Sequence, residues 1–362
     1  MTRMCAFSLI FFLVAAPVAR ADRVTDIVPL NARSQGMGQT GVNASNDSYA
    51  AFINPANLAS KRNKPHFEII NAQIEGSENA GNALFSGRKN PMSLGDVYPY
   101  LKSNKGEWAG YRYSIYPNFT SRFLSVGLLY DAKFAAKYDL ADPNIVGDTD
   151  KVTHKGYRRV MPTASLSFRL FGGILRFGYT LGLEYLGVVN SVVTSPDTKQ
   201  LSHSNGIYEG IAVRNTAGLT LTLPYAHLPS FSFVARDIGN ARYHGGGLRE
   251  VRKMTFDGGV SYSTYFSRWL EMMLTADYRD ITNQLGTGSR MRRLFTGTEI
   301  RVGKAVSLRG GYAQGYPAAG LGFRMNRLKM DLSYYKDERG DRLRDDGDDT
   351  FALQITWSLL NQ

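Results

Sequence analysis

Apolar and polar residues alternate along fourteen stretches of the chain, from about Phe67 to Leu360. The last stretch, Phe351–Leu359, shows the pattern clearly, because every second residue is large and apolar and the residues between them are small or polar. Successive side chains of a β-strand point to opposite faces, so each stretch predicts a strand with one apolar and one polar face. The predicted strands lie near residues 65–75, 110–119, 121–138, 157–171, 174–190, 209–223, 231–241, 254–266, 269–281, 292–303, 305–315, 317–326, 327–337 and 349–360.

The connections between these strands alternate in length. Those after strands two, four, six, eight, ten and twelve are short, as at Gly172-Gly173. Those after strands one, three, five, seven, nine and thirteen are long and polar, as at Asp139–Gly156 and Glu338–Asp348. The connection after strand eleven, around Gly315, is a short exception. A soluble β-sandwich would share the alternation within strands but gives no reason for this alternation of connections.

Outer-membrane barrels have short periplasmic turns and longer extracellular loops. The sequence therefore predicts an all-β fold, a transmembrane antiparallel β-barrel of about fourteen strands with both termini in the periplasm. Most predicted strands have close to the ~9–11 residues that a tilted strand needs to cross a bilayer. We expect the protein in the outer membrane of a Gram-negative bacterium, in contact with outer-membrane lipid and lipopolysaccharide and inserted by the barrel-assembly machinery.

The first residues predict a secretion signal. Arg3 supplies a positive start, Cys5–Ala19 is an uncharged apolar run, and Ala19-Arg20-Ala21 offers the small residues of a cleavage site. The run falls short of the ~20 residues of a membrane-spanning helix. Cleavage after Ala21 would remove the one cysteine, which excludes disulfides and thiolate chemistry. We expect residues 1–21 to be the signal peptide, 22–64 a separate N-terminal segment and 65–362 the barrel.

The chain has 43 Lys and Arg against 31 Asp and Glu, a formal net charge of +12. The basic residues are dispersed rather than clustered, so no nucleic-acid partner is expected; anionic lipid headgroups or an anion-favouring lumen would account for the excess. Charges within strands should face the lumen, because a charge facing lipid at mid-membrane costs ~2–4 kcal/mol. They would form either a conduit or binding site, or a structural ladder of ion pairs. The lumen-lining candidates are Arg169, Arg176, Glu184, Arg236, Glu271, Asp277, Glu299, Arg301, Arg309 and Arg324, together with Lys329 and Asp331.

A glycine-rich polar segment precedes the first predicted strand. Asp47 is placed to cap a short helical turn through Ser48–Phe52, and the pair Asn54-Pro55 favours a turn. Barrels much larger than ~8 strands leave a lumen that must be filled or left as a channel. We therefore expect residues 22–64 to fold inside the barrel as a hatch or plug.

This segment resembles the N-terminus of the FadL-type family of outer-membrane transport proteins for hydrophobic compounds. The strands from Leu308–Tyr312 to Leu328–Tyr334 are also similar to the closing strands of the wider superfamily, which includes PorV-like proteins that serve protein secretion. The hatch motif that carries the resemblance comprises Gly36, Gly38, Asp47, Asn54, Pro55 and Ala56.

The resemblance implies an outer-membrane channel for the passive uptake of small hydrophobic compounds, either fatty-acid-like or aromatic. Members bind a hydrophobic ligand near the extracellular side, pass it to an inner pocket and release it through a lateral opening between strands. The chain is shorter than typical fatty-acid transporters, chiefly in the extracellular loops. The long loop Gly76–Glu107 would either capture ligand or pack on itself. Its ligand-capture candidates are Leu84, Phe85, Met92, Leu94 and Tyr98.

No catalytic set stands out, because the five histidines are widely spaced. The acidic loop Asp337–Asp349 lacks the residue order of a calcium loop. We expect no enzymatic activity, no cofactor and no metal. Two functions from different classes remain: a channel for small hydrophobic molecules, and a non-transporting PorV-like accessory that engages a secreted or envelope protein. An apolar pocket beside the hatch would favour the channel.

Overall fold

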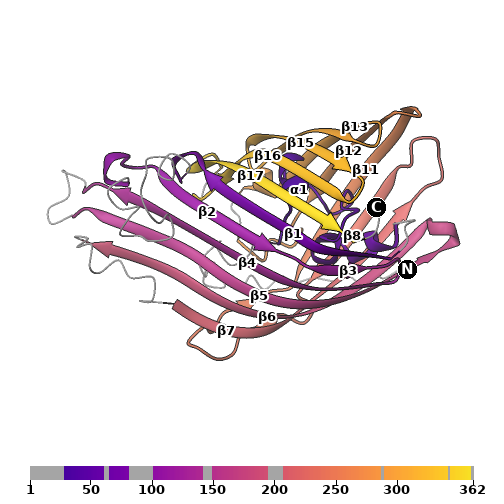
Figure 1. Cartoon of the computed structure of the whole chain (residues 1–362). Coiled ribbons are helices and arrows are strands. Elements are labelled where there is room, and N and C mark those ends of the chain that lie inside the picture. Colours follow the sequence, from indigo (N-terminus) through magenta and orange to yellow (C-terminus); the bar gives the residue numbers. More distant parts are fainter. Residues whose placement is uncertain are drawn as a thin grey trace, which may run out of the picture.

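The computed structural model describes residues 28–60, 65–80, 101–141, 149–194, 207–286, 289–340 and 343–359. Its barrel strands form one antiparallel sheet, and the last strand, β17 (Gly347–Ser358), pairs with the first, β1 (His66–Ser77), which closes the sheet into a barrel (Figure 1). Between them lie β2 (Trp108–Ile115), β3 (Asn118–Thr120), β4 (Leu124–Asp139), β5 (Lys151–Leu170), β6 (Leu175–Thr194), β7 (Ile207–Thr222), β8 (Ser230–Arg236), β11 (Thr255–Ser267), β12 (Leu270–Tyr278), β13 (Leu294–Val302), β14 (Val306–Ala313), β15 (Tyr316–Met325) and β16 (Leu328–Glu338).

The prediction of a fourteen-stranded barrel is confirmed. Strands β2 and β3 cross the wall as one strand that is interrupted at Tyr116-Pro117, since both pair with β1 on one side and β4 on the other. Each predicted stretch coincides with one crossing, and the connections alternate in length as expected, with Gln314-Gly315 as the short exception. A separate two-stranded sheet, β9 (Ala241–Arg242) and β10 (Val251–Arg252), lies in the long connection after β8.

Strands β4 to β7 continue beyond the ends of the shorter strands (Figure 1). β5 and β6 have 20 residues each, and β5 begins at Lys151 rather than at the predicted residue 157. The predicted long connection Asp139–Gly156 therefore wrongly includes residues 151–156, which belong to β5. Val152 is buried against Leu101 and Tyr138. Leu101 lies in the connection between β1 and β2, so this connection covers the outer face of β5 at Val152. Among Val152, His154 and Gly156 on that face, only Val152 is apolar, which explains why the pattern missed the start of the strand.

The outer surface of the barrel is apolar. Residues such as Ile74, Leu128 and Leu181 are 65%, 46% and 48% exposed, whereas the alternate positions on the same strands are buried or half-buried. Exposed aromatic residues collect at the turns of the short-connection end, as the girdle of a membrane barrel requires. They are Phe123, Phe171, Tyr225, Tyr265, Phe266 and Trp269. Within the described residues, none of the helices is long and apolar enough to span a membrane.

A β-bulge explains the irregular sequence of β1. Glu68 and Asn71 are three residues apart, which would place them on opposite faces of a regular strand. The register shifts between Glu68 and Ile70, and both polar side chains consequently lie inside, where Asn71 Nδ2 donates to Glu68 Oε2 at 2.8 Å. Ile69 and Ile70 are both exposed on the outer surface.

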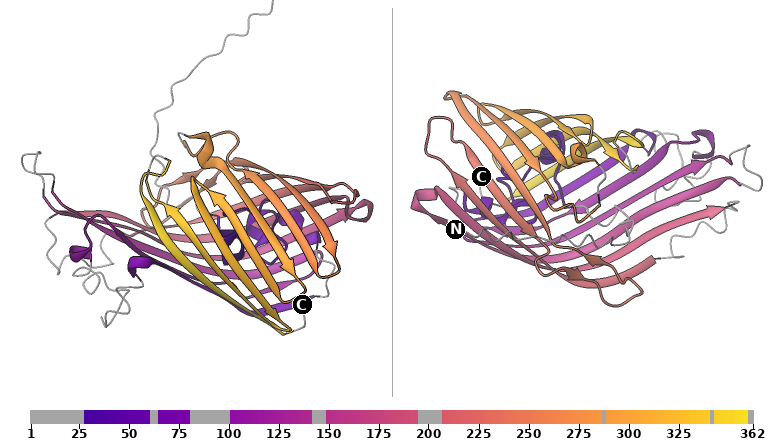
Figure 2. Two further views of the ribbon diagram at one scale, coloured as in Figure 1. Left: turned by 90° about the horizontal axis from the view of Figure 1, so that it is seen from above. Right: turned by 180° about the vertical axis from the view of Figure 1, so that it is seen from behind.

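Residues 28–60 lie inside the barrel, where the strands surround them (Figure 2). They form α1 (Ala32–Gly36), α2 (Ala50–Ile53) and the 3₁₀ helix η2 (Pro55–Ser60). α1 packs on β14 to β17 and η2 packs on β5 to β7, so the segment reaches from one side of the inner wall to the other. Two further 3₁₀ turns, η3 (Phe171–Gly173) and η4 (Arg290–Arg293), lie in connections.

The side of the membrane that each end of the barrel faces can be tested with an epitope tag. A tag inserted between Ala141 and Thr149 should bind antibody on intact cells, because long connections of such barrels face the exterior. The same tag at Gly172-Gly173 should bind only after the outer membrane is permeabilised. The reverse pattern would contradict periplasmic termini.

Candidate functional site

Glycines of three neighbouring strands receive the first part of the N-terminal segment. A Cβ at Gly36 would meet Gly320 Cα of β15 at 2.9 Å. Gly38 has a φ of +63° and lies against backbone atoms of β13 and β14, where Gly297 and Gly311 have no side chain. The two backbones can approach this closely only because both partners are glycines. The predicted pair Gly36 and Gly38 therefore fixes α1 to the inner wall.

Asn54, Pro55 and Ala56 are held in the same way on the opposite side of the barrel. Asn54 is fully buried; its Nδ2 donates to Val42 O at 2.7 Å and to Thr220 Oγ1 of β7 at 3.1 Å. Its Oδ1 accepts from Ala56 N at 3.1 Å, which caps η2. A Cβ at Gly218 of β7 would overlap Asn54, and one at Gly178 of β6 would overlap the backbone of Pro55.

The helix beside these residues begins later than predicted. α2 starts at Ala50 with Tyr49 as its N-cap, and that cap makes no side-chain hydrogen bond. Asp47 instead accepts from Tyr49 N at 3.0 Å and from Asn31 Nδ2 at 2.8 Å. It therefore ties the turn before α2 to the residue that caps α1.

A buried ion-pair network joins Arg33 of α1 to the wall. Arg33 donates to both oxygens of Glu299 on β13, at 2.9 and 2.8 Å. Burial alone would lower the pKa of the Arg33 guanidinium, but the Glu299 carboxylate and its hydrogen bonds hold that pKa above its ordinary value. The network continues across the wall through Arg301 to Glu271 and through Arg309 to Asp331, which also pairs with Lys329. Because the charges are paired and buried, they hold the segment in place rather than line an open path.

A second series of ion pairs runs around the inner wall from β1 to the end of β8. Acidic and basic residues alternate in it, and five of its six contacts have N···O distances between 2.5 and 3.6 Å. Alternation of this kind neutralises most of the buried charge and stiffens the wall. In order the residues are Glu75, Arg112, Asp131, Arg159, Glu184, Arg214 and Asp237.

A cavity of about 260 Å³ lies at the end of the barrel that carries the long connections. The N-terminal segment contributes Val28, Leu30, Gln35 and Gln39 to its lining. Charged side chains dominate the remainder. Eleven are cationic: Arg112, Lys133, Lys155, Arg214, Arg236, Arg252, Lys253, Arg279, Arg292, Arg293 and Arg339. Six are acidic: Glu75, Asp237, Asp257, Asp280, Asp337 and Glu338.

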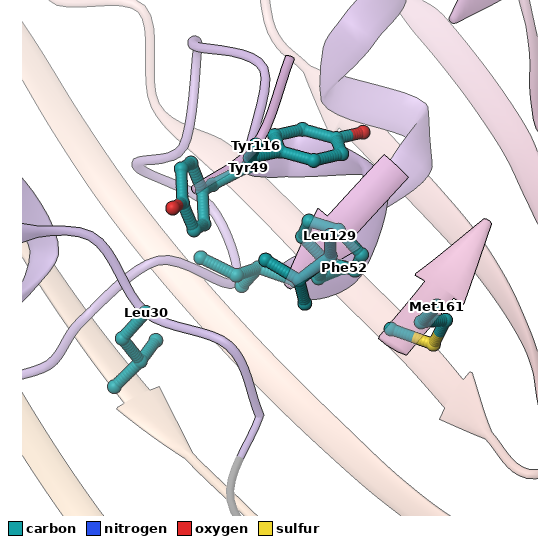
Figure 3. Packing of buried hydrophobic residues seen from close by; sticks show 7 residues of the cluster. Leu30, Tyr49, Phe52, Tyr116, Leu129 and Met161 are labelled. Atoms are coloured by element: carbon teal, nitrogen blue, oxygen red, sulfur yellow. The ribbon is translucent and has the colours of Figure 1, made fainter. Parts of the chain in front are cut away.

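An apolar cluster lies within the lumen (Figure 3). The Phe52 ring lies 5.7 Å from that of Tyr49 and 4.8 Å from that of Tyr116, measured between centroids. Leu30 belongs to both the cluster and the cavity lining, and Val28 packs against the cluster while also lining the cavity. The charged cavity and the apolar cluster are therefore contiguous. The cluster consists of Leu30, Tyr49, Phe52, Ile53, Tyr116, Leu129 and Met161.

The wall is irregular where this cluster touches it. β2 ends at Ile115 and β3 begins at Asn118, and Pro117 between them has no N–H to donate to a neighbouring strand. The bulge of β1 lies opposite this interruption, since Ala72 pairs with Ile115 and Glu68 with Asn118. The Tyr116 side chain is fully buried and fills this position from inside.

The ten charged residues that the sequence predicted to line the lumen do not form one site. Of the ten candidates, Arg236 alone belongs to the described cavity lining; it donates to Phe52 O and Ile53 O at 2.6 and 2.7 Å. Asp277 accepts from Gly41 N and Val42 N of the N-terminal segment. Arg176 donates to Thr222 Oγ1, Arg169 is half-buried, and Arg324 is exposed near the short-connection end. Glu184, Glu271, Glu299, Arg301 and Arg309 belong to the two ion-pair networks.

The ligand-capture candidates Leu84, Phe85, Met92, Leu94 and Tyr98 lie outside the described residues. Sequence reasoning also missed most of the cavity. Arg214 could have been found, because it shares the inward phase of Ala212 and Thr216 on β7. Arg279 and Arg293 could also have been found, because they lie in the predicted strands 269–281 and 292–303, in phase with Asp277 and Glu299. Arg252 comes from a connection, where no alternation marks the direction of a side chain.

No protein-family model and no curated protein matches the chain. Solved structures do match it. One is the TodX deltaS2S3 mutant monoaromatic hydrocarbon channel, with a TM-score of 0.53 and 10% sequence identity over 92% of this chain and 99% of that one. Another is the Ralstonia pickettii toluene transporter TbuX, with a TM-score of 0.52 and 12% identity over the same shares of the two chains. At this identity the likeness concerns the fold alone, and the chain has the barrel fold of these two proteins.

Proposed function

We propose that the protein is an outer-membrane channel for small hydrophobic compounds, with residues 28–60 as its hatch. The observation that carries this proposal is the continuity between the cavity at the long-connection end and the apolar cluster through Leu30. A cavity that adjoins an apolar cluster offers a ligand with a carbon skeleton both polar and apolar contacts. The similar structures named a monoaromatic hydrocarbon channel and a toluene transporter make aromatic compounds the first candidates.

In this proposal, the ligand leaves sideways into the membrane at Tyr116-Pro117. The interruption between β2 and β3 and the bulge of β1 lie beside the apolar cluster, and Ile69 and Ile70 are exposed on the outer side. Movement of the Tyr116 side chain, together with Phe52 of the hatch, would connect the cluster to the surrounding lipid. Such a path keeps an apolar ligand out of water from the cavity to the bilayer.

The hatch can be loosened at its best-defined bend by changing Asn54 and Pro55 to Ala. The change removes the hydrogen bonds to Val42 O, Thr220 Oγ1 and Ala56 N, each worth about 1 kcal/mol, and it frees the φ angle that Pro55 fixes. We expect the barrel to fold and the uptake of labelled toluene and of a labelled fatty acid to rise several-fold. Uptake should be measured in cells with this variant, in cells with the unaltered protein and in cells that lack the gene.

Pro162→Ala is a suitable control, because Pro162 lies on the exposed face of β5, away from the hatch. This variant should take up both compounds at the rate of the unaltered protein. Equal rates in all cells, including those that lack the gene, would contradict the channel. The PorV-like accessory function would then take its place, and a search for a secreted or envelope protein that co-purifies with the barrel would follow.

A further inference from the structure

The lining of the cavity has more positive than negative charge. Eleven cationic side chains face six carboxylates among the described residues. Several of these carboxylates already have short contacts: Glu75 with Arg112, Asp237 with Arg214, and Asp257 with Arg236. The cations that line the cavity therefore outnumber the carboxylates there, and a bound anion would offset part of this excess.

Arg252 of β10 is a buried cation whose carboxylate partner is distant and shared. It is only 4% exposed, and its nearest carboxylate, Glu184, is 3.8 Å from its Nη1. Glu184 is already bound more closely by Arg214 at 2.6 Å and by the hydroxyl of Tyr243. The Nε and Nη2 atoms of Arg252 are buried and have no hydrogen-bond partner among the described residues. Such donors are rare in folded proteins and call for an acceptor.

Arg279 and Arg293 line the same cavity and extend this group. The two residues are joined through their backbones, since Arg279 N donates to Arg293 O at 2.9 Å. Their side-chain contacts in the described structure are with carbonyl oxygens and aromatic rings: Arg279 contacts Gln39 O and lies over Phe295, and Arg293 contacts Asp280 O. The Nε atom of each has no hydrogen-bond partner there. Burial lowers the pKa of Arg279, although the nearby carboxylates of Asp277 and Asp257 act in the opposite direction.

Each of the three guanidinium groups lies over an aromatic ring. The guanidinium carbon of Arg252 lies 5.5 Å from the centroid of the Tyr243 ring. The corresponding distance is 4.4 Å from Arg279 to Phe295 and 5.3 Å from Arg293 to Tyr278. A guanidinium that stacks on a ring still has N–H groups in its own plane, which is the geometry that a carboxylate accepts.

From these contacts we propose that the cavity binds a small organic acid, whose carboxylate lies among Arg252, Arg279 and Arg293. The inference refines the proposed channel function and rests on it. The volume of about 260 Å³ is below the range of ~300–1,000 Å³ that is usual for ligand pockets, so it suits a compact acid rather than a long acyl chain. The carbon skeleton of the acid would point toward Leu30 and the apolar cluster.

Calorimetry on the purified full-length protein in detergent tests this site. Benzoate should bind, toluene should bind far more weakly although it has the same ring, and decanoate should gain nothing from its longer chain. The double variant Arg252→Gln and Arg279→Gln should bind benzoate at least about tenfold more weakly, because two charge-assisted contacts are lost. High salt should weaken benzoate binding to the unaltered protein but not the residual binding of toluene.

Arg242→Gln is the matched control. Arg242 lies on the same small sheet as Arg252, but its side chain is exposed and outside the cavity lining. This variant should bind benzoate as the unaltered protein does. If the double variant does not fold, the two single variants replace it, and the preference of the unaltered protein for benzoate over toluene decides independently. Absence of benzoate binding, equal binding of benzoate and toluene, or tighter binding of decanoate would overturn the proposal.

The outcomes also separate this site from the channel. If benzoate binding is saturable but uptake does not depend on the protein, the binding site is supported and the channel function is contradicted. If toluene uptake depends on the protein but benzoate does not bind, the channel function is supported and the binding site is contradicted.

Discussion

Alanine at Gly311 should push the hatch off the wall and raise the conductance of the barrel, whereas alanine at Gly310 should change nothing. A Cβ at Gly311 would come closer than 3.0 Å to backbone atoms of Met37 and Gly38, which cannot move without the whole segment. A Cβ at Gly310 points outward and first meets Thr298 Cγ2 at 3.7 Å, an ordinary contact. Single-channel recordings in planar bilayers would measure the difference.

Gly218→Ala provides an independent version of this experiment. It acts on the opposite side of the barrel, where the added methyl would overlap Asn54. It should raise conductance as Gly311→Ala does, because each substitution puts a methyl group where the backbone or a side chain of the hatch packs directly on a glycine. Conductance that stays at the level of the unaltered protein in both folded variants would show that residues 28–60 do not limit permeation.

Arginine at Leu353 should impair assembly strongly, and arginine at Leu359 should impair it little. Both leucines have the outward phase of the last strand. Leu353 lies near the middle of the strand, and Leu359 lies just past its end, at the end of the barrel that carries the short connections. An arginine that faces lipid costs ~2–4 kcal/mol at mid-membrane and ~0–1 kcal/mol near the interface. The fraction of heat-modifiable, folded barrel in outer-membrane fractions measures the effect.

The inward neighbour Gln354 is a poorer control for this substitution. Gln354 is buried; it accepts from Ala32 N at 3.2 Å and donates to Asn71 Oδ1 at 2.7 Å, so a change there would disturb the hatch as well. Equal assembly of the two leucine variants would contradict the register of β17 and the apolar outer belt.

The barrel could be predicted from the sequence because both of its signals are local. Residues such as Leu353 and Gln354 alternate along a strand, and the length of each connection is read directly from the chain. The extension of β5 could not be predicted in this way. Val152 is covered by Leu101, a residue about fifty positions away, and a strand covered by chain rather than by lipid need not keep a continuous apolar face.

The candidate site was predictable only in part, for a related reason. The glycines and Asn54 of the hatch motif have local conformational preferences, so they could be singled out before their partners were known. Their partners, Gly178, Gly218 and Gly311, lie in strands where a glycine has no evident role until another backbone is placed against it. The cavity is less local still, because its lining combines residues from the N-terminal segment, such as Leu30, with residues from strands and connections as far apart as Arg112 and Arg339.

One amide of the hatch has a consequence for the assembly of the barrel. Ala32 N donates to Gln73 Oε1 of the first strand at 3.0 Å and to Gln354 Oε1 of the last strand at 3.2 Å, and these glutamines face each other across the seam. Contacts across that seam join residues far apart in the sequence, 283 positions for Asn71 and Gln354, so they form late and slowly during folding. A hatch that entered after closure would have to carry its buried charges in through one end of the finished barrel. We therefore expect filling and sealing to be one step of biogenesis, in which the nascent N-terminus acts as a template on which the first and last strands meet.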